Sequence, residues 1–308
     1  MGNKRQRISI RERILSWHKA RSKGRTSGRK WNWVGMLKVA TVMGLLVGVG
    51  LFLRYAEGFV RAAHAGEEGA LILVEVPAWV NWDLKARVAE MAGGSRFPIQ
   101  DETAEVVSRN LAPMAWLDNT SVQVTHDAVR VKAHWRKPVA LIESQKGATK
   151  YYVDSDLVVL DYMPMSHLPI VEVKGMAPGL APTPGERFDR DDLAAAVALI
   201  CLLDRADAEF APKTPLVEQI KSIDISNFKG RRQPLKPHIV LNTKSGMQIW
   251  WGAEIGEWAK HLEAKDEDKL ANLYTHYMEY GLVSAEARYI NVRDPRDRNY
   301  TPIDKYRK

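Results

Sequence analysis

The chain has 308 residues, a formal net charge of +8 and an ordinary apolar fraction of 45%. Its single cysteine, Cys201, excludes an internal disulfide framework and a zinc site built on paired cysteines. About 240 residues follow the first long apolar run, enough for one large or two small domains with cores of their own.

The positive charge is concentrated in residues 1–30. This segment contains eleven Lys and Arg residues and one acid, Glu12, so that its net charge is about +10 and that of the remaining 278 residues is about −2. Short flanks rich in Lys and Arg stay in the cytoplasm. We therefore predict a basic cytoplasmic tail that contacts anionic lipid. A nucleic-acid-binding arm is the alternative, and we expect no nucleic-acid partner.

An uncharged apolar run occupies residues 39–53. A helix needs roughly 20 residues to cross the hydrocarbon core, and residues 33–37 and Tyr55 extend the run toward that length. We predict one transmembrane helix at residues 31–56, with the N-terminus in the cytoplasm and the bulk of the chain on the other side. Residues suited to the membrane interfaces flank the run: Trp31, Trp33, Lys38, Arg54 and Tyr55.

A cleaved signal peptide is the competing interpretation of this run. Ala63-His64-Ala65 has the small-x-small form of a cleavage site. The basic region before the run is much longer than that of a signal peptide, and charged residues separate the run from Ala65. We therefore favour a retained anchor.

The segment after the span predicts a small α+β domain. A linker at residues 57–69 leads to a domain at residues 70–137, in the order strand, helix, helix, strand, strand. Its elements are a strand at residues 71–76, a helix capped by Asp83 and stopped by Gly93-Gly94, a helix from Asp101 ended by Pro113, and a hairpin that turns at His126-Asp127.

Pro138 marks a boundary, because proline cannot donate to a strand ladder. Residues 138–295 then predict a mixed β domain with helices on one face, followed by a polar tail at residues 296–308. The expected strands are residues 139–142, 151–153, 157–160, 220–225, 238–241, 247–251 and 288–292, with a loop at 176–187, a helix capped by Asp189 and a helix that carries Trp258 to Tyr277.

Several short motifs occur in order along this region. They are Arg136-Lys137-Pro138-Val139-Ala140, Tyr152-Val153-Asp154, Leu168-Pro169 with Gly175, residues 245–252, and Tyr289-Ile290-Asn291-Val292-Arg293. With the anchor, they resemble the FtsQ/DivIB family of bacterial cell-division proteins over roughly residues 30–300. The chain departs from the family pattern at Val76-Pro77, where the first strand of the family usually ends in a Val-x-Gly step, and at Asn291, where the family has Asp.

The resemblance implies a single-pass inner-membrane protein of the division septum with a POTRA domain and a β domain. It implies a non-enzymatic scaffold that links early and late division proteins and binds FtsB/FtsL-like partners through an exposed edge strand, while the POTRA domain meets others. The residues it points to for partner binding are Arg288, Tyr289, Ile290, Asn291, Val292, Arg293, Tyr300, Arg231 and Arg232. A core strand that needs no partner is the alternative for the last strand.

The sequence gives no catalytic constellation, and we expect no cofactor. Asp154-Ser155-Asp156 could bind a metal, but two carboxylates between apolar runs are typical of a hairpin turn. Lys244-Ser245-Gly246 only superficially matches a penicillin-binding motif.

Trp250, Trp251 and Trp258 gather near one hairpin, and a glycan-binding face is one interpretation. We favour packing, with Trp250 and Trp251 on opposite faces of a strand.

Two other functional classes stay open. A membrane-anchored POTRA component of a secretion or outer-membrane transport machine would share the first domain, but such proteins usually carry repeats or lead into a barrel. A cell-wall enzyme would need catalytic residues that the sequence does not display.

Overall fold

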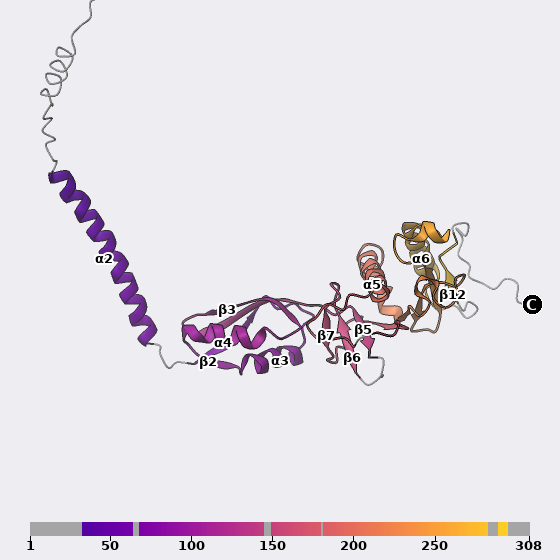
Figure 1. Ribbon diagram of the computed structural model, residues 1–308, viewed down its shortest axis with the longest axis horizontal. Coiled ribbons are helices and arrows are strands. Elements are labelled where there is room, and N and C mark those ends of the chain that lie inside the picture. Colours follow the sequence, from indigo (N-terminus) through magenta and orange to yellow (C-terminus); the bar gives the residue numbers. More distant parts are fainter. Residues whose placement is uncertain (1–32, 64–67, 145–148, 180, 283–288, 295–308) are drawn as a thin grey trace, which may run out of the picture. The chain divides into compact units, whose positions relative to one another are not determined.

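The computed structural model describes residues 33–63, 68–144, 149–179, 181–282 and 289–294 (Figure 1). Residues 1–63 and 64–308 form two separate units. The basic tail at residues 1–30 and the polar tail at residues 296–308 therefore lie outside the described residues.

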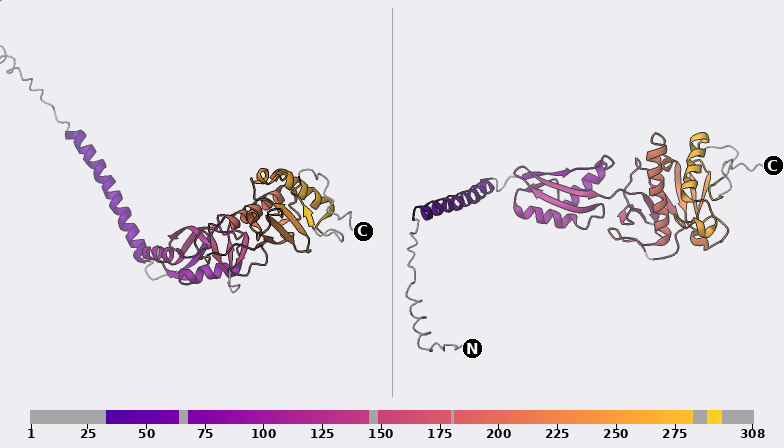
Figure 2. Two further views of the ribbon diagram at one scale, coloured as in Figure 1. Left: turned by 45° about the vertical axis from the view of Figure 1, so that its right-hand side comes forward. Right: turned by 90° about the horizontal axis from the view of Figure 1, so that it is seen from above.

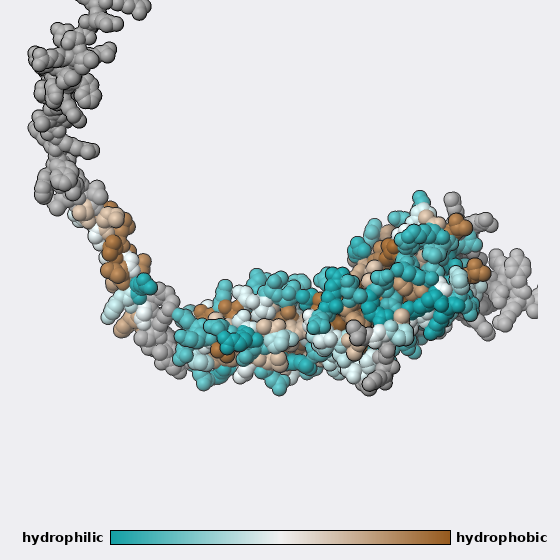
Figure 3. Space-filling model, viewed as in Figure 1, coloured by the Kyte–Doolittle hydropathy of each residue, from teal (hydrophilic) through white to brown (hydrophobic). Residues whose placement is uncertain are grey.

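The first unit contains helix α2, Trp33–Ala63. Its described apolar side chains are exposed, Leu46 by 62% and Phe52 by 67%, and they form the brown stretch of the helix in Figure 3. Over the residues that the structure describes, no helix combines the length and the apolarity needed to cross a membrane. The helix extends beyond residue 56 into the segment predicted as a linker, and the next strand begins at Glu68.

The second unit is α+β, as predicted, and begins with a four-stranded sheet in the order β2-β1-β4-β3. The strands β1 and β4 are parallel, while the hairpin β3-β4 and the pair β1-β2 are antiparallel. The elements are β1 Glu68–Val74, α3 Trp82–Ala92, β2 Arg96–Pro98, α4 Asp101–Leu111, β3 Leu117–Val124 and β4 Ala128–Trp135.

Two details of this first sheet differ from the prediction. The short strand β2 lies between the helices, so the order is strand, helix, strand, helix, strand, strand. The N-cap of α3 is Asn81 rather than Asp83, because the Asn81 side chain accepts a hydrogen bond from the Leu84 N–H. The predicted C-terminal stop is confirmed, since Gly93 adopts the left-handed conformation.

An eight-stranded sheet follows, in the order β12-β11-β10-β9-β8-β5-β6-β7. Its strands are β5 Ala140–Glu143, β6 Lys150–Val153, β7 Val159–Asp161, β8 Val171–Lys174, β9 Ile220–Asp224, β10 Ile239–Thr243, β11 Gln248–Gly252 and β12 Tyr289–Asn291. The helical segments are α5 Asp191–Phe210, η1 Val217–Gln219, η2 Phe228–Gly230, η3 Trp258–His261 and α6 Asp266–Tyr280.

Two predictions for this sheet were wrong. The strand β8, which lies inside the sheet between β5 and β9, was not expected at all. The single helix expected from Trp258 to Tyr277 is broken, because Leu262 has a left-handed backbone (φ 54°) and the chain then turns before α6.

The helices α5 and α6 cover one face of this sheet, as predicted (Figures 1 and 2). A row of paired apolar residues crosses that face from strand to strand, and all of them are buried: Val173, Ile223, Leu241, Ile249 and Ile290. The two helices also contact each other, since the Tyr274 hydroxyl donates to Asp207 at 2.7 Å and lies 3.0 Å from the Leu203 carbonyl oxygen.

The opposite face of this sheet, which we call the open face, is covered at one end and partly exposed at the other. At the β6-β7 end, Tyr152 and Leu160 join the hydrophobic core of the four-stranded sheet. At the β9-β12 end, Val240 lies among polar and aromatic side chains, and none of Asp224, Trp250 and Tyr289 is fully buried. The candidate site lies at this second end.

Candidate functional site

The strand β12 forms one end of the eight-stranded sheet and pairs in parallel with β11. The Val292 N–H donates to the Trp250 carbonyl at 3.3 Å. Backbone groups of a strand alternate between its two neighbours. The N–H and C=O groups of Tyr289 and Asn291 therefore point away from β11, toward the outer edge of the sheet.

The side chains of β12 separate by face. Ile290 and Val292 are completely buried on the helix-covered face, whereas Tyr289 is 40% exposed on the open face. The Tyr289 ring stacks on Trp250, with centroids 3.9 Å apart and planes 4° apart. One face of the strand thus belongs to the core, which fixes its position, and no described strand pairs with its outer edge.

The tryptophans near β12 pack against other side chains of the chain, as favoured from the sequence. Trp251 is fully buried and lies under the Lys269 ammonium group, 5.2 Å from the ring centroid. Trp250 projects from the open face onto Tyr289. The prediction that these two side chains occupy opposite faces of a strand is confirmed. Trp258 lies in η3, with the Lys265 ammonium group 5.8 Å from its ring.

A groove of about 480 Å³ lies beside this stack on the open face. Trp250, Val240 and Asp224 contribute from three adjacent strands, and the loop 226–237 forms the opposite wall. Leu235, in that loop, is 92% exposed. The cationic side chains that line the groove are Arg232, Lys236 and Arg293.

Asn227 builds the loop that forms this wall. Its side-chain oxygen accepts from the N–H groups of Arg232 and Gln233 at 3.0 and 2.8 Å. Its amide nitrogen, which carries two hydrogens, lies within hydrogen-bond distance of the carbonyls of Gln233, Lys236 and Pro237. One side chain therefore contacts five backbone groups of a long loop, which sequence analysis did not detect because the partners carry no common motif.

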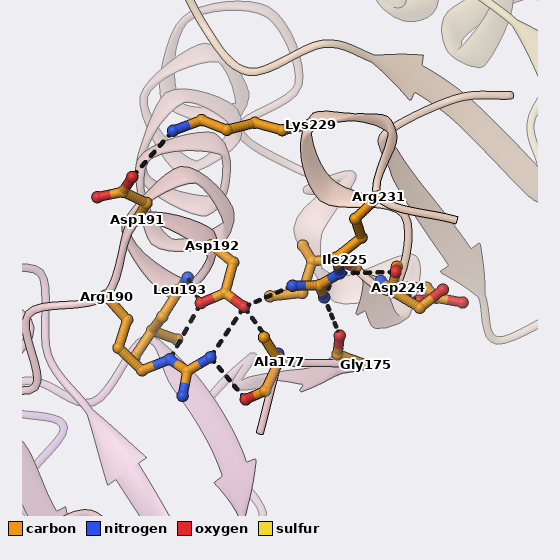
Figure 4. A network of polar contacts seen from close by, with 11 residues as sticks. Gly175, Ala177, Arg190, Asp191, Asp192, Leu193, Asp224, Ile225, Lys229 and Arg231 are labelled. Atoms are coloured by element: carbon orange, nitrogen blue, oxygen red, sulfur yellow. Dashed lines mark hydrogen bonds and ion pairs between the residues drawn. The ribbon is translucent and has the colours of Figure 1, made fainter. Parts of the chain in front are cut away.

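Arg231 is committed to the structure of the same loop (Figure 4). Its guanidinium group donates to the carbonyls of Gly175, Ile225 and Ser226 and forms an ion pair with Asp192. Gly175 has φ 76°, and a side chain there would meet the Ser226 nitrogen at 2.7 Å, so only glycine fits. The predicted pair of partner-binding arginines is thus divided: Arg232 lines the groove, and Arg231 anchors the loop.

Asp192, in the first turn of α5, is the centre of that anchor. Its carboxylate accepts from Arg190, from Arg231 and from the Ala177 N–H at 2.9 Å, and its side chain is 6% exposed. Burial alone would raise its pKa, but the hydrogen bonds from Arg190, Ala177 and Arg231 outweigh burial and lower the pKa to about 2. The carboxylate is therefore ionised at any physiological pH.

Arg293, expected at the partner interface, also has an internal partner. Its Nε donates to Glu263 at 2.8 Å, and its carbonyl accepts from the Ala264 N–H at 2.7 Å. The Arg293 N–H donates to the Asn291 side chain. Both backbone groups of Arg293 are therefore bonded within the chain.

The remaining predicted residues are distributed as follows. Trp31, Arg288 and Tyr300 lie outside the described residues, and the side chains of Trp33 and Lys38 are not described. Arg54 and Tyr55 are exposed on α2.

Asp154 is a turn residue, as favoured from sequence, because its side chain accepts from the N–H groups of Asp156 and Val158 and pairs with Arg136. The described part of the chain holds no group of three or more acidic, histidine or cysteine side chains placed to bind a metal.

No protein-family model matches this chain, and no curated protein matches it either.

Proposed function

We propose that this chain is a non-enzymatic scaffold that binds an extended segment of a partner protein by strand addition at the outer edge of β12. The observation that carries the proposal is the arrangement of this strand. Its apolar side chains are fixed in the core, while the backbone donors and acceptors of Tyr289 and Asn291 face outward.

The other sheet ends favour β12 as the docking edge. The segment 185–188 covers β7, because the Val159 N–H bonds to the Glu186 carbonyl and the Gly185 N–H bonds to the Val159 carbonyl. The β3-β4 ladder is interrupted between Asp118 and Ser121, whereas β2, like β12, has three residues. Covered or irregular edges resist pairing, which favours β12 over β7 and β3. Among the described strands, β12 pairs only with β11.

The groove beside β12 favours a particular kind of partner. Arg232 and Lys236 place positive charge on the loop wall, and Trp250 and Leu235 offer apolar contact. An incoming segment with acidic and apolar side chains would complement this surface. The backbone contacts would supply affinity, and the groove would supply selectivity.

The ordered motifs and the basic tail support a role in cell division. By resemblance to the FtsQ/DivIB family, the partners are FtsB/FtsL-like membrane proteins, and the four-stranded sheet with its two helices serves as the POTRA domain. The uncharged run at residues 39–53 would anchor the chain in the inner membrane, with the second unit outside the cytoplasm at the septum.

Replacing Asn291 by proline tests strand addition. Proline removes an N–H that points outward and leaves the Val292 bond to β11 in place. We expect Asn291→Pro to weaken capture of the FtsB/FtsL-like pair by the full-length chain roughly tenfold, since a lost hydrogen bond contributes about 1 kcal/mol and the ring obstructs the incoming strand.

Asn291→Ala is the matched control, because it removes the side chain and keeps the backbone N–H. Capture should stay within about twofold of the unmodified chain. Equal capture by the proline variant, with the fold intact by circular dichroism, would contradict docking at β12. Failure of the unmodified chain to capture the pair would contradict the assigned partners.

A further inference from the structure

A buried carboxylate lies beneath the end of the docking strand. The Glu263 side chain is 4% exposed. One of its oxygens accepts from Arg293 Nε at 2.8 Å, and the other accepts from Lys269 Nζ at 2.8 Å and from the Ala253 N–H at 2.9 Å. Every bond comes from a charged group or a backbone amide, so the carboxylate is well satisfied despite its burial.

These contacts join four segments of the chain, of which the one that contains Arg293 lies 30 residues from Glu263. Ala253 directly follows β11, Glu263 lies between η3 and α6, Lys269 is in α6, and Arg293 lies two residues after β12. Arg293 is held twice, since its carbonyl also accepts from the Ala264 N–H. We call Glu263, Lys269 and Arg293 the clasp.

The backbone next to the clasp leaves room for the carboxylate. Gly252 has φ 95°, and a Cβ atom at that position would lie 2.2 Å from one Glu263 oxygen and 2.4 Å from the other. Any other residue there would displace the carboxylate from its three donors. The last residue of β11 is thus matched to the clasp.

The Glu263 carboxylate is surrounded by charged groups, so its removal would affect both Lys269 and Arg293. Lys269 is completely buried, and its ammonium group lies 2.8 Å from Glu263 and 3.9 Å from Asp266. Burial raises the pKa of Glu263, but the bonds from Lys269, Ala253 and Arg293 together bring it below its ordinary value. Removing the carboxylate would leave a buried lysine without its closest partner and release the Arg293 side chain.

We propose that Glu263 is a positioning residue for the docking edge. It holds β12 against β11, so that the outward backbone groups of Tyr289 and Asn291 are fixed before a partner binds. An edge that is already ordered binds more tightly, because less conformational entropy is lost on association. This inference rests on the proposed function.

Hydrogen exchange of the full-length chain in detergent, without any partner, tests the clasp. Glu263→Gln should speed exchange of the Ile290 and Val292 amides at least tenfold relative to the amides of β9 and β10. Lys269→Met should not speed exchange of the β12 amides relative to the β9 and β10 amides, because Glu263 keeps its bond to Arg293.

A double variant separates positioning from general stability. Glu263→Leu with Lys269→Met removes both buried charges and restores an apolar interior. We expect its thermal stability to recover while β12 still exchanges fast, because Arg293 has lost its acceptor. Slow β12 exchange in Glu263→Gln, or recovery of β12 protection in the double variant, would overturn the proposal.

Partner capture by Glu263→Gln tests the clasp and the docking edge separately. Fast β12 exchange with reduced capture of the FtsB/FtsL-like pair would support both the clasp and the docking edge. Fast exchange with unchanged capture would overturn the role of β12 in docking, and with it the link from Glu263 to binding.

Discussion

Asp192→Asn should destabilise the second unit and loosen the loop that forms the groove wall. The substitution keeps the size of the side chain but removes its charge. Arg190 and Arg231, which both donate to this carboxylate, would then face a neutral amide. The Ala177 N–H would compete for the one remaining carbonyl oxygen.

The magnitude follows from the pKa of the carboxyl group. Its value falls from 3.8 to about 2 on folding. One pKa unit corresponds to about 1.4 kcal/mol, so the ionised carboxylate stabilises the fold by about 2 kcal/mol. Because the folded-state pKa is the lower one, this contribution is complete above about pH 4 and is lost as the pH falls through about 2.

Urea unfolding followed by circular dichroism at pH 7 measures this effect. We expect Asp192→Asn to lose about 2 kcal/mol, and its unfolding free energy to fall less than that of the unmodified protein on acidification from pH 5 to 2. Trypsin should also cleave after Arg232 faster in the variant, since Arg231 no longer anchors the loop to α5.

The adjacent residue provides a matched control. Asp191 pairs with Lys229 at 2.9 Å, but both side chains are more than half exposed. An exposed pair contributes little, so Asp191→Asn should change the unfolding free energy by less than about 1 kcal/mol. Equal effects of the two substitutions, or a loss below about 0.5 kcal/mol in Asp192→Asn, would refute the assignment of Asp192 as the anchor.

Two further predictions concern the loop and the proposed anchor. Asn227→Ala should speed tryptic cleavage after Arg232 and weaken partner capture, because the loop loses the side chain that contacts five of its backbone groups; unchanged cleavage would contradict its role in the loop. Leu46→Arg with Val47→Arg places two charges in the uncharged run, at a cost of roughly 3 kcal/mol each in a bilayer. The double variant should be absent from carbonate-washed membranes, whereas the control Arg54→Lys should be retained in them.

Local patterns predicted those elements of the fold that are local in sequence. Burial alternates along β3, and the hairpin β3-β4 turns at His126 and Asp127, as predicted. The strand β8 was missed because its four residues lie between Pro169 and Gly175, in a segment interpreted only as leading into the loop at residues 176–187. Its two partners, β5 and β9, are both parallel and distant in sequence, so no turn signal marks the pairing.

The site could be predicted only in part, for a related reason. The alternation in Tyr289-Ile290-Asn291-Val292 indicates a strand with one buried face, which the structure has. The internal bonds of Arg231 and Arg293 could not be predicted, because their acceptors, Asp192 and Glu263, are 39 and 30 residues away. A basic residue in a motif gives no sign of whether its charge is already paired.

The most direct test of strand addition is residue-resolved amide hydrogen exchange of the full-length chain with and without the FtsB/FtsL-like pair. Strand addition predicts that the Tyr289 and Asn291 amides become protected on binding, while the Val292 amide, already bonded to Trp250, changes little. Protection that appears instead on β3 or β7, with Tyr289 and Asn291 unchanged, would contradict docking at β12.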